Sequence, residues 1–183
     1  ADSNGSETLA VLTSDQGNTG AGGTLTDTDT VSITMTAVND APINTVPGTQ
    51  TTNEDTDLVV SGISIVDVDV AAANMQVTLT VASGSLGINT AVTNGVSAAQ
   101  VATNNSASVV ITAPLSNINT TLADAAGLTY SPTADSNGSD TLTVLTSDQG
   151  NTGAGGTLTD TDTVSITITA VNDAPINTVP GAQ

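Results

Sequence analysis

The residues best suited to chemistry in this sequence are carboxylates placed beside turn-forming residues. Several of them recur where an alternating stretch gives way to a loop: Asp135, Asp140, Asp148, Asp160, Asp162 and the pair Asn172-Asp173. Calcium takes about six to eight oxygen ligands, and Asp, Glu and Asn side chains together with loop carbonyls supply such ligands. The pattern therefore indicates cation binding at the ends of strands.

Catalysis finds little support in the same residues. The chain has no His, Cys, Lys or Arg, which excludes a Ser–His pair, a reactive thiol, a Schiff base and a cationic oxyanion stabiliser. A carboxylate pair could act as acid and base. However, Tyr130 is the sole aromatic residue, so no aromatic platform for a substrate is available. We expect a protein that is not an enzyme.

The formal net charge of −18 also limits the partners. Two carboxylates about 4 Å apart repel each other by ~4 kcal/mol at an effective dielectric of 20, and no basic side chain offsets this repulsion. Bound cations, hydrogen bonds or solvent screening must therefore offset the repulsion between carboxylates. Nucleic acid and anionic membrane surfaces require Lys and Arg and are excluded as partners. No apolar run of about 18 residues occurs, so we expect no membrane insertion in this segment.

A long internal repeat sets the domain organisation. Ala1 to Gln50 returns as Ala134 to Gln183, an offset of 134 − 1 = 133 residues, with four differences: Glu7/Asp140, Ala10/Thr143, Met35/Ile168 and Thr49/Ala182. So long a period is typical of a tandem array of whole domains. We expect residues 1–42 to be the C-terminal part of a preceding repeat, 43–175 a complete repeat and 176–183 the start of the next.

Period-two alternation predicts the strands. Residues 7–13 and 30–36 alternate Thr with apolar residues, and the turn-rich stretch 14–23 joins them as a hairpin loop. Met35/Ile168 is then expected on the inward face, whereas Glu7/Asp140 and Ala10/Thr143 are expected on the outward face. We interpret Asp27 and Asp29, with their copies Asp160 and Asp162, as solvated residues at strand entry. A lone pair of strands is marginal in water, so residues 1–42 require completion by other residues or another molecule.

The rest of the unit also indicates a β fold. Further strands are expected over 58–60, 63–65, 75–81, 108–112 and 127–131, with a hairpin turn at Asn94-Gly95 and a polar, turn-rich segment over 43–57. Apolar spacing predicts one short helix near 116–124, with Ser116 as a possible cap. Tyr130 is expected to be a buried corner residue with its hydroxyl bonded to backbone. The fold class is therefore all-β, an antiparallel Greek-key β-sandwich.

Four motifs carry a resemblance to a known family. They are Asn39-Asp40-Ala41-Pro42, its copy Asn172-Asp173-Ala174-Pro175, Asp67-Val68-Asp69 and the run from Leu142 to Gly150. These resemble the linker, the Asp-x-Asp turn and the late strand of cadherin-type repeats, and the whole cassette is similar to the cadherin-like repeats of large bacterial surface adhesins. The resemblance implies a cadherin/Ig-like sandwich in a tandem array, with Ca²⁺ bound at both ends of each unit.

Carried over by position, the resemblance also implies two ligand sets. One end would use Asp67, Asp69 and Asp148 with Asn39 and Asp40 of the linker and Asp2 of the preceding unit. The other end would use Glu54, Asp135, Asn172 and Asp173. The alternative interpretation is that Asn-Asp-Ala-Pro is only a turn that ends a strand, because Pro holds the residue before it extended.

The function expected from these observations is structural. The chain would be a non-enzymatic repeat of an extracellular or cell-surface adhesin or stalk, secreted, stiffened by calcium and in contact with neighbouring repeats of the same chain. The alternative is a subunit of a self-assembling extracellular filament or sheath, in which identical chains exchange strands along a fibre. A carbohydrate- or protein-binding tip is a third possibility, which near-identical copies without aromatics disfavour.

Overall fold

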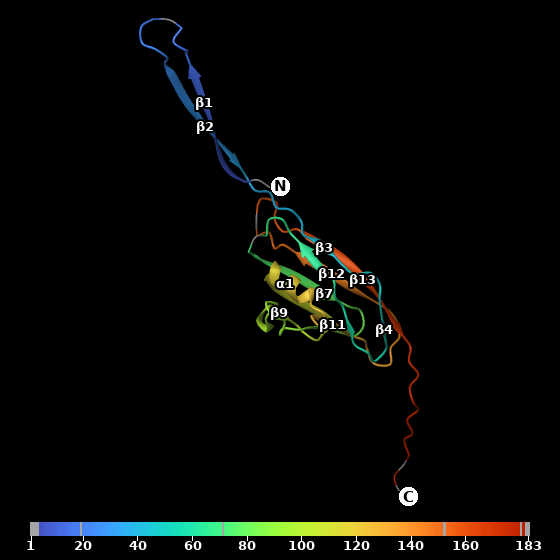
Figure 1. The fold of residues 1–183 in the computed structure, drawn as a ribbon. Helices are drawn as coiled ribbons and strands as arrows, with labels where there is room; N and C mark the ends of the chain where they lie inside the picture. Colours follow the sequence, from blue (N-terminus) through green and yellow to red (C-terminus); the bar gives the residue numbers. More distant parts are fainter. Residues whose placement is uncertain (1–3, 19, 71, 152, 180, 182–183) are drawn as a thin grey trace.

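The computed structural model describes residues 4–18, 20–70, 72–151, 153–179 and 181, and these form an all-β protein with one short α-helix. The strands form antiparallel sheets stacked as a sandwich over residues 43–169, as the alternation predicts. Figure 1 shows a separate strand pair at one end of the sandwich and the extended C-terminal segment at the other. Within the described residues, no helix has the length and apolar character needed to cross a membrane.

The strand pair is the hairpin of β1 (Gly5–Ser14) and β2 (Thr26–Met35), which confirms both strands expected in this region. Its antiparallel register runs from Gly5↔Met35 to Ser14↔Thr26. Both faces of the hairpin are exposed, since the sandwich lies beyond its end and not against its side. The hairpin therefore has a complete internal ladder but no core of its own.

The larger sheet of the sandwich has six strands in the order β4–β13–β12–β7–β10–β9. The strands are β4 (Gln50–Asn53), β13 (Thr159–Thr169), β12 (Gly138–Ser147), β7 (Asn74–Thr80), β10 (Ser108–Pro114) and β9 (Val101–Ala102). Every neighbouring pair is antiparallel except β4 and β13, which run parallel. The sheet is therefore antiparallel, as expected, except at this one edge.

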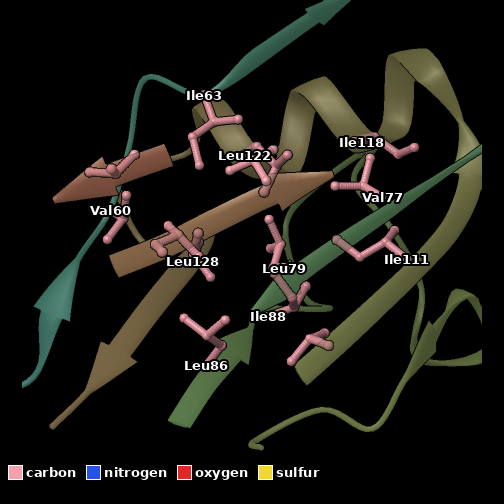
Figure 2. Packing of buried hydrophobic residues seen from close by; sticks show 14 of the residues in the cluster. Val60, Ile63, Val77, Leu79, Leu86, Ile88, Ile111, Ile118, Leu122 and Leu128 are labelled. Carbon is pink, nitrogen blue, oxygen red and sulfur yellow. The ribbon is translucent and has the colours of Figure 1, made fainter. Parts of the chain in front are cut away.

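The opposite layer is made of shorter elements. These are β5 (Leu58–Val59), β11 (Leu128–Ser131) and β8 (Ser85–Ile88) in one sheet, β3 (Ile43–Thr45) and β6 (Ser64–Val66) in another, with η1 (Ala98–Gln100) and α1 (Leu115–Ala123). Figure 2 shows Leu79 and Ile111 of the large sheet in one cluster with Leu122 of α1 and Leu128 of β11. Alternate residues of β7, β10, β12 and β13 enter this cluster, which explains the period-two pattern of these strands.

The helix α1 lies within one residue of the expected range. Ile118 and Leu122 face the core and are fully buried. Pro114 is the N-cap residue, so the expected cap at Ser116 is wrong. Proline suits this position because its fixed φ needs no adjustment and its missing N–H has no partner to lose.

The expected hairpin at Asn94-Gly95 is also wrong. The chain does turn there, with Asn94 at φ 60°, but the flanking strands β8 and β9 pair with β11 and β10. The turn instead packs on α1, because Val96 N–H donates to Thr121 Oγ1 at 2.8 Å. A Cβ at Gly95 would lie 2.5 Å from that same oxygen, so only glycine fits.

Two strands, β3 and β4, lie in the segment expected to be only polar turns. Both are edge strands, and each buries a single polar residue, Asn44 in β3 and Thr52 in β4. Asn44 Oδ1 accepts a hydrogen bond from Thr146 Oγ1 at 2.6 Å, which joins β3 to β12. Strands stabilised by such polar contacts lack the apolar alternation that reveals strands in a sequence.

The expected outward position of Asp140 is wrong. Asp140 is 5 % exposed and shares the inward face of β12 with Leu142. Its carboxylate accepts hydrogen bonds from Ala82 N and Ser83 N, both at 3.0 Å, and from the Tyr130 hydroxyl at 3.0 Å. Tyr130 is buried as expected, but its hydroxyl donates to this side chain and not to backbone. Burial and the negative charge of Asp140 raise the pKa of Tyr130.

Candidate cation sites at the two ends of the unit

The end of the sandwich nearest the β1–β2 hairpin is called the upper end here, and the opposite end is the lower end (Figure 1). At the upper end, the linker after β2, residues 37–42, contacts the loop between β12 and β13. Asn39 N–H donates to Ala154 O at 3.0 Å, and Ala154 N–H donates to Ala37 O at 2.9 Å. The Asn39 side chain is 5 % exposed, and its Nδ2 donates to Asp148 Oδ2 and, at 2.8 Å, to Gly156 O. The linker is therefore bonded to the unit through both backbone and side chain.

Asp148 holds the same loop in shape. Its Oδ1 accepts hydrogen bonds from Gly150 N and Leu158 N, both at 2.8 Å. The copy in the hairpin does the same, because Asp15 Oδ1 accepts from Gly17 N at 2.9 Å and Leu25 N at 2.8 Å. These backbone donors lower the pKa of the Asp15 carboxyl. The loop geometry is therefore local, whereas the contact with Asn39 depends on the neighbouring linker.

Asp67 and Asp69 lie next to Asp40, the linker residue that follows Asn39. Asp69 Oδ2 accepts a hydrogen bond from Asp40 N at 2.9 Å. Asp67 Oδ1 accepts from Asp69 N and Val70 N, both at 3.1 Å, which makes a tight acidic turn. Partial burial, with Asp69 beside it, raises the pKa of the Asp67 carboxyl. The site therefore disfavours the negative charge that Asp67 carries at neutral pH.

Two buried oxygens at this end have no hydrogen-bond donor among the described residues. They are Asn39 Oδ1 and Asp67 Oδ2. A buried oxygen without a partner costs free energy, and native proteins rarely leave one unsatisfied. The chain contains no Lys, Arg or His that could donate to either. Both atoms are hard oxygen donors of the kind that Ca²⁺ prefers, so the residues present fit that ion.

At the lower end, Glu54 ties the chain that leaves β13 to the start of the unit. Glu54 is 5 % exposed. Its Oε1 accepts a hydrogen bond from Val171 N at 2.7 Å, and its Oε2 accepts one from Asn137 Nδ2 at 3.3 Å. Its own N–H donates to Thr169 O at 2.9 Å. Glu54 thus orients the first residues of the outgoing linker.

Three exposed carboxylates meet beside Glu54. Oxygens of Asp55, Asp135 and Asp173 lie within 4.8 Å of one another. Oxygens that share one calcium ion at about 2.3 to 2.6 Å are separated by no more than about 5 Å, so this spacing fits a common ion. Asp135 N–H donates to Asp55 Oδ1 at 3.1 Å, which fixes part of the arrangement. Desolvation, followed by the charges of Asp135, Asp55 and Glu54, raises the pKa of Asp173.

The upper-end residues expected from the sequence fall into two adjoining groups. Asn39 contacts Asp148, and Asp40 contacts Asp69 beside Asp67, with the peptide bond between Asn39 and Asp40 joining the two groups. Asp2, expected at the same end, lies outside the described residues.

At the lower end, the structure brings Glu54, Asp135 and Asp173 together, whereas Asn172 is exposed on the segment after β13. Sequence reasoning missed Asp55, although its place beside Glu54 in a turn was an available signal. It also treated Asp160 as solvated. Asp160 is half-buried, and its Oδ2 accepts a hydrogen bond from Asn44 N at 2.6 Å.

Comparison with known proteins adds no family to this description. No family model matches the chain, and no curated protein matches it.

Proposed function

We propose that this chain is a non-enzymatic structural repeat of an extracellular or cell-surface adhesin or stalk, with calcium at the junctions between repeats. One observation carries the proposal. The linker Ala-Val-Asn-Asp-Ala-Pro occurs twice, at 37–42 and 170–175, and the two copies contact opposite ends of the same unit. If one linker made the contacts of both copies, it would join two successive units at a single junction.

These two sets of contacts are compatible on one linker. In the first copy, Ala37 O and Asn39 N bond to the unit that follows. In the second copy, Val171 N, the equivalent of Val38 N, bonds to Glu54 of the unit that precedes. Successive backbone groups of an extended chain point to opposite sides, so one linker can hold both units at once.

The carboxylates of the two sets also converge on one residue. Asp173 brings its side chain to Asp55 and Asp135 of the preceding unit. Its copy Asp40 gives its N–H to Asp69 of the following unit. An assembled junction therefore gathers acidic and amide oxygens from three parts of the chain: Glu54, Asp55 and Asp135 before the linker, Asn39 and Asp40 within it, and Asp67, Asp69 and Asp148 after it.

This gathering explains how the linker would be stiffened. Without counter-charge, the carboxylates on the two units repel each other and favour a bent or open linker. Calcium, when bound, supplies positive charge and the coordination of several oxygens. Asn39 and Glu54 orient the linker through neutral and charged hydrogen bonds in either case. The exposed lower cluster suits the weak affinity, with Kd about 10⁻⁴ to 10⁻³ M, of extracellular calcium modules.

Small-angle X-ray scattering of the full chain tests this function. In 2 mM calcium, an amount chosen to exceed about 10⁻³ M, the hairpin, unit and tail should hold one extended arrangement. In a chelator the scattering should show a broader range of shapes. The Asp67→Asn, Asp69→Asn double variant is the matched control and should respond less. Identical curves for the unmodified chain with calcium and with chelator would sink the proposal.

A further inference from the structure

Two segments from opposite ends of the unit's sequence lie side by side. Residues 38–53 are called the entry segment here, and residues 154–169 are called the exit segment. Val38 and Ala154, the first residues of the two segments, form a parallel β-bridge. At the other end of the segments, β4 pairs in parallel with β13. Figure 1 shows β3 and β4 beside β13, between the upper and the lower end of the unit.

One register joins the two segments along their length. Val38 and Ala154 differ by 154 − 38 = 116 residues. Every pair of β4 with β13 has the same difference, as in 169 − 53 = 116. Between these contacts, Asn44 N–H donates to Asp160 Oδ2 at 2.6 Å, again 116 residues apart. The contacts at the top, the middle and the bottom of the unit therefore belong to one parallel arrangement.

Tension on the two linkers would load this arrangement in shear. The entry segment begins at the upper end, where Asn39 contacts the β12–β13 loop, and runs to the lower end, where Glu54 follows β4. The exit segment runs in the same direction and passes into the outgoing linker at the lower end. A pull on both linkers therefore draws the segments along their own axes in opposite directions. The hydrogen bonds between strands run mostly across this direction, so they are loaded together.

The lower end of the arrangement is the most strongly bonded part. β4 is the edge strand of the larger sheet, so its pairing with β13 is what joins the entry segment to that sheet. Glu54 extends this pairing, because its N–H donates to Thr169 O at 2.9 Å and its Oε1 accepts from Val171 N at 2.7 Å. Glu54 is buried, which limits the competition of water for these bonds. β3 also pairs with β6, so part of the load passes to the opposite layer.

We propose that the entry and exit segments form a mechanical clamp, the contact that must rupture before tension can unfold the unit. The use of this clamp rests on the proposed structural function, because only a chain that carries tension needs it. The clamp itself consists of backbone pairs and of hydrogen bonds to Asp160 and Glu54. Its resistance therefore needs no calcium.

The direction of pull then decides how long the unit stays folded. Forced unfolding is governed by the rate of unfolding and not by the free energy of unfolding. Rupture in shear breaks several hydrogen bonds in one step, so its barrier contains all of them. Opening the same contact from one end breaks one pair after another, so its barrier contains few of them. A contact that only stabilised the fold would show no such dependence on direction.

Pairs of introduced cysteines set the direction of pull, because the chain has no cysteine of its own. Thr36→Cys with Ala174→Cys holds the full chain by the two linkers and loads the clamp in shear. Thr56→Cys with Ala174→Cys holds both segments at the lower end and opens the clamp pair by pair. All three positions are exposed. Optical tweezers at constant force, in a chelator, measure the lifetime of the folded unit in each direction.

A matched pair of substitutions tests the middle of the clamp. Asp160→Ala removes the acceptor of the Asn44 N–H. Asp162→Ala removes the same charge two residues further along the same face of β13, where the carboxylate accepts no hydrogen bond from the described residues. Each substitution is made in both cysteine pairs.

We expect the unit to unfold more than about tenfold faster when it is opened from the lower end than in shear, at the same force. In shear, Asp160→Ala should speed unfolding about tenfold, because a hydrogen bond to a charged group is lost, and Asp162→Ala should have no effect. In the opening direction, neither substitution should change the rate. Equal lifetimes in the two directions, or an equal effect of Asp160→Ala in both, would overturn the clamp. A failure of the calcium proposal shows instead as unchanged scattering curves, so the two failures are distinguishable.

Discussion

The side-chain amide of Asn39 donates a hydrogen bond to the carboxylate of Asp148, across 109 residues of sequence. This bond joins the linker that precedes the unit to the loop between its last two strands. Asp148 has a copy, Asp15, in the same local loop without such a linker. Comparing Asp148 with Asp15 therefore separates the hydrogen bonds within the loop from the additional bond to Asn39.

Asp148→Ala should destabilise the sandwich by about 3 kcal/mol. The substitution leaves Gly150 N, Leu158 N and Asn39 Nδ2 without their acceptor at a buried position. Asp15→Ala removes the same loop bonds from the exposed hairpin, so it should leave the main unfolding transition unchanged. Urea unfolding followed by far-ultraviolet circular dichroism measures both. If Asp15→Ala lowers the free energy of unfolding as much as Asp148→Ala does, the contact with Asn39 does not account for the loss.

Tyr130→Phe should cost about 1.5 to 3 kcal/mol, because Asp140 loses a buried hydrogen bond to a charged acceptor. Tyr130 is the sole tyrosine, so absorbance near 295 nm reports its ionisation alone. Its folded pKa is raised, so stability falls as pH rises above the unfolded value of about 10. Ionisation should therefore coincide with alkaline unfolding. Ionisation at pH 10 in the folded chain would contradict the buried contact.

Asp135→Asn should stabilise the chain in the absence of divalent ions and weaken its response to calcium. The change removes one of three carboxylates whose oxygens lie within 4.8 Å. Asp162→Asn removes the same charge from β13, outside both clusters, and serves as the control. Melting temperatures of the three chains, with chelator and with calcium, measure the effect. If Asp162→Asn changes the calcium response as much as Asp135→Asn, only the total charge matters.

Stability without calcium should rise as pH is lowered from 7 toward about 4. The pKa values of Asp67 and Asp173 are raised in the folded chain, so the folded state binds protons more strongly than the unfolded state. The stability that these groups contribute is fully present below the unfolded pKa of about 3.9 and is lost as pH rises through the folded pKa. Differential scanning calorimetry across this range checks the sign. Stability that falls steadily on acidification would contradict it.

The strands with an apolar face were predictable because alternation is a local property. Apolar and polar residues alternate over 75–81 and 108–112, and this alternation alone predicts β7 and β10. β3 and β4 gave no such signal, since their buried positions hold Asn44 and Thr52.

Asp140 shows a second limit on what the sequence alone predicts. Strict alternation puts position 140 on the same face as Leu142, so the outward position expected for Asp140 disagreed with the pattern itself. The hydrogen-bond donors that allow a carboxylate there come from Ala82, Ser83 and Tyr130 on other elements. No local pattern reveals such donors.

The candidate sites were predictable in composition but not in arrangement. The acidic turns and the Asn-Asp linker mark the ends of the unit in the sequence. However, identical linkers at 39–40 and 172–173 make different contacts, because one meets the top of a unit and the other meets the bottom. Environment is a property of the assembled fold, so only the structure shows which end of the unit each copy contacts.

The melting temperature of the full chain in calcium and in chelator tests the central claim most directly. An ion that binds only the folded state and is present at 100 times its Kd, which is about 10 mM for a Kd of about 10⁻⁴ M, stabilises that state by about 2.7 kcal/mol. For a unit of this size, this raises the melting temperature by roughly 5 to 10 °C. We predict a rise of this order in calcium at neutral pH, reduced in the Asp67→Asn, Asp135→Asn double variant. The same melting temperature in calcium and in chelator would contradict the account.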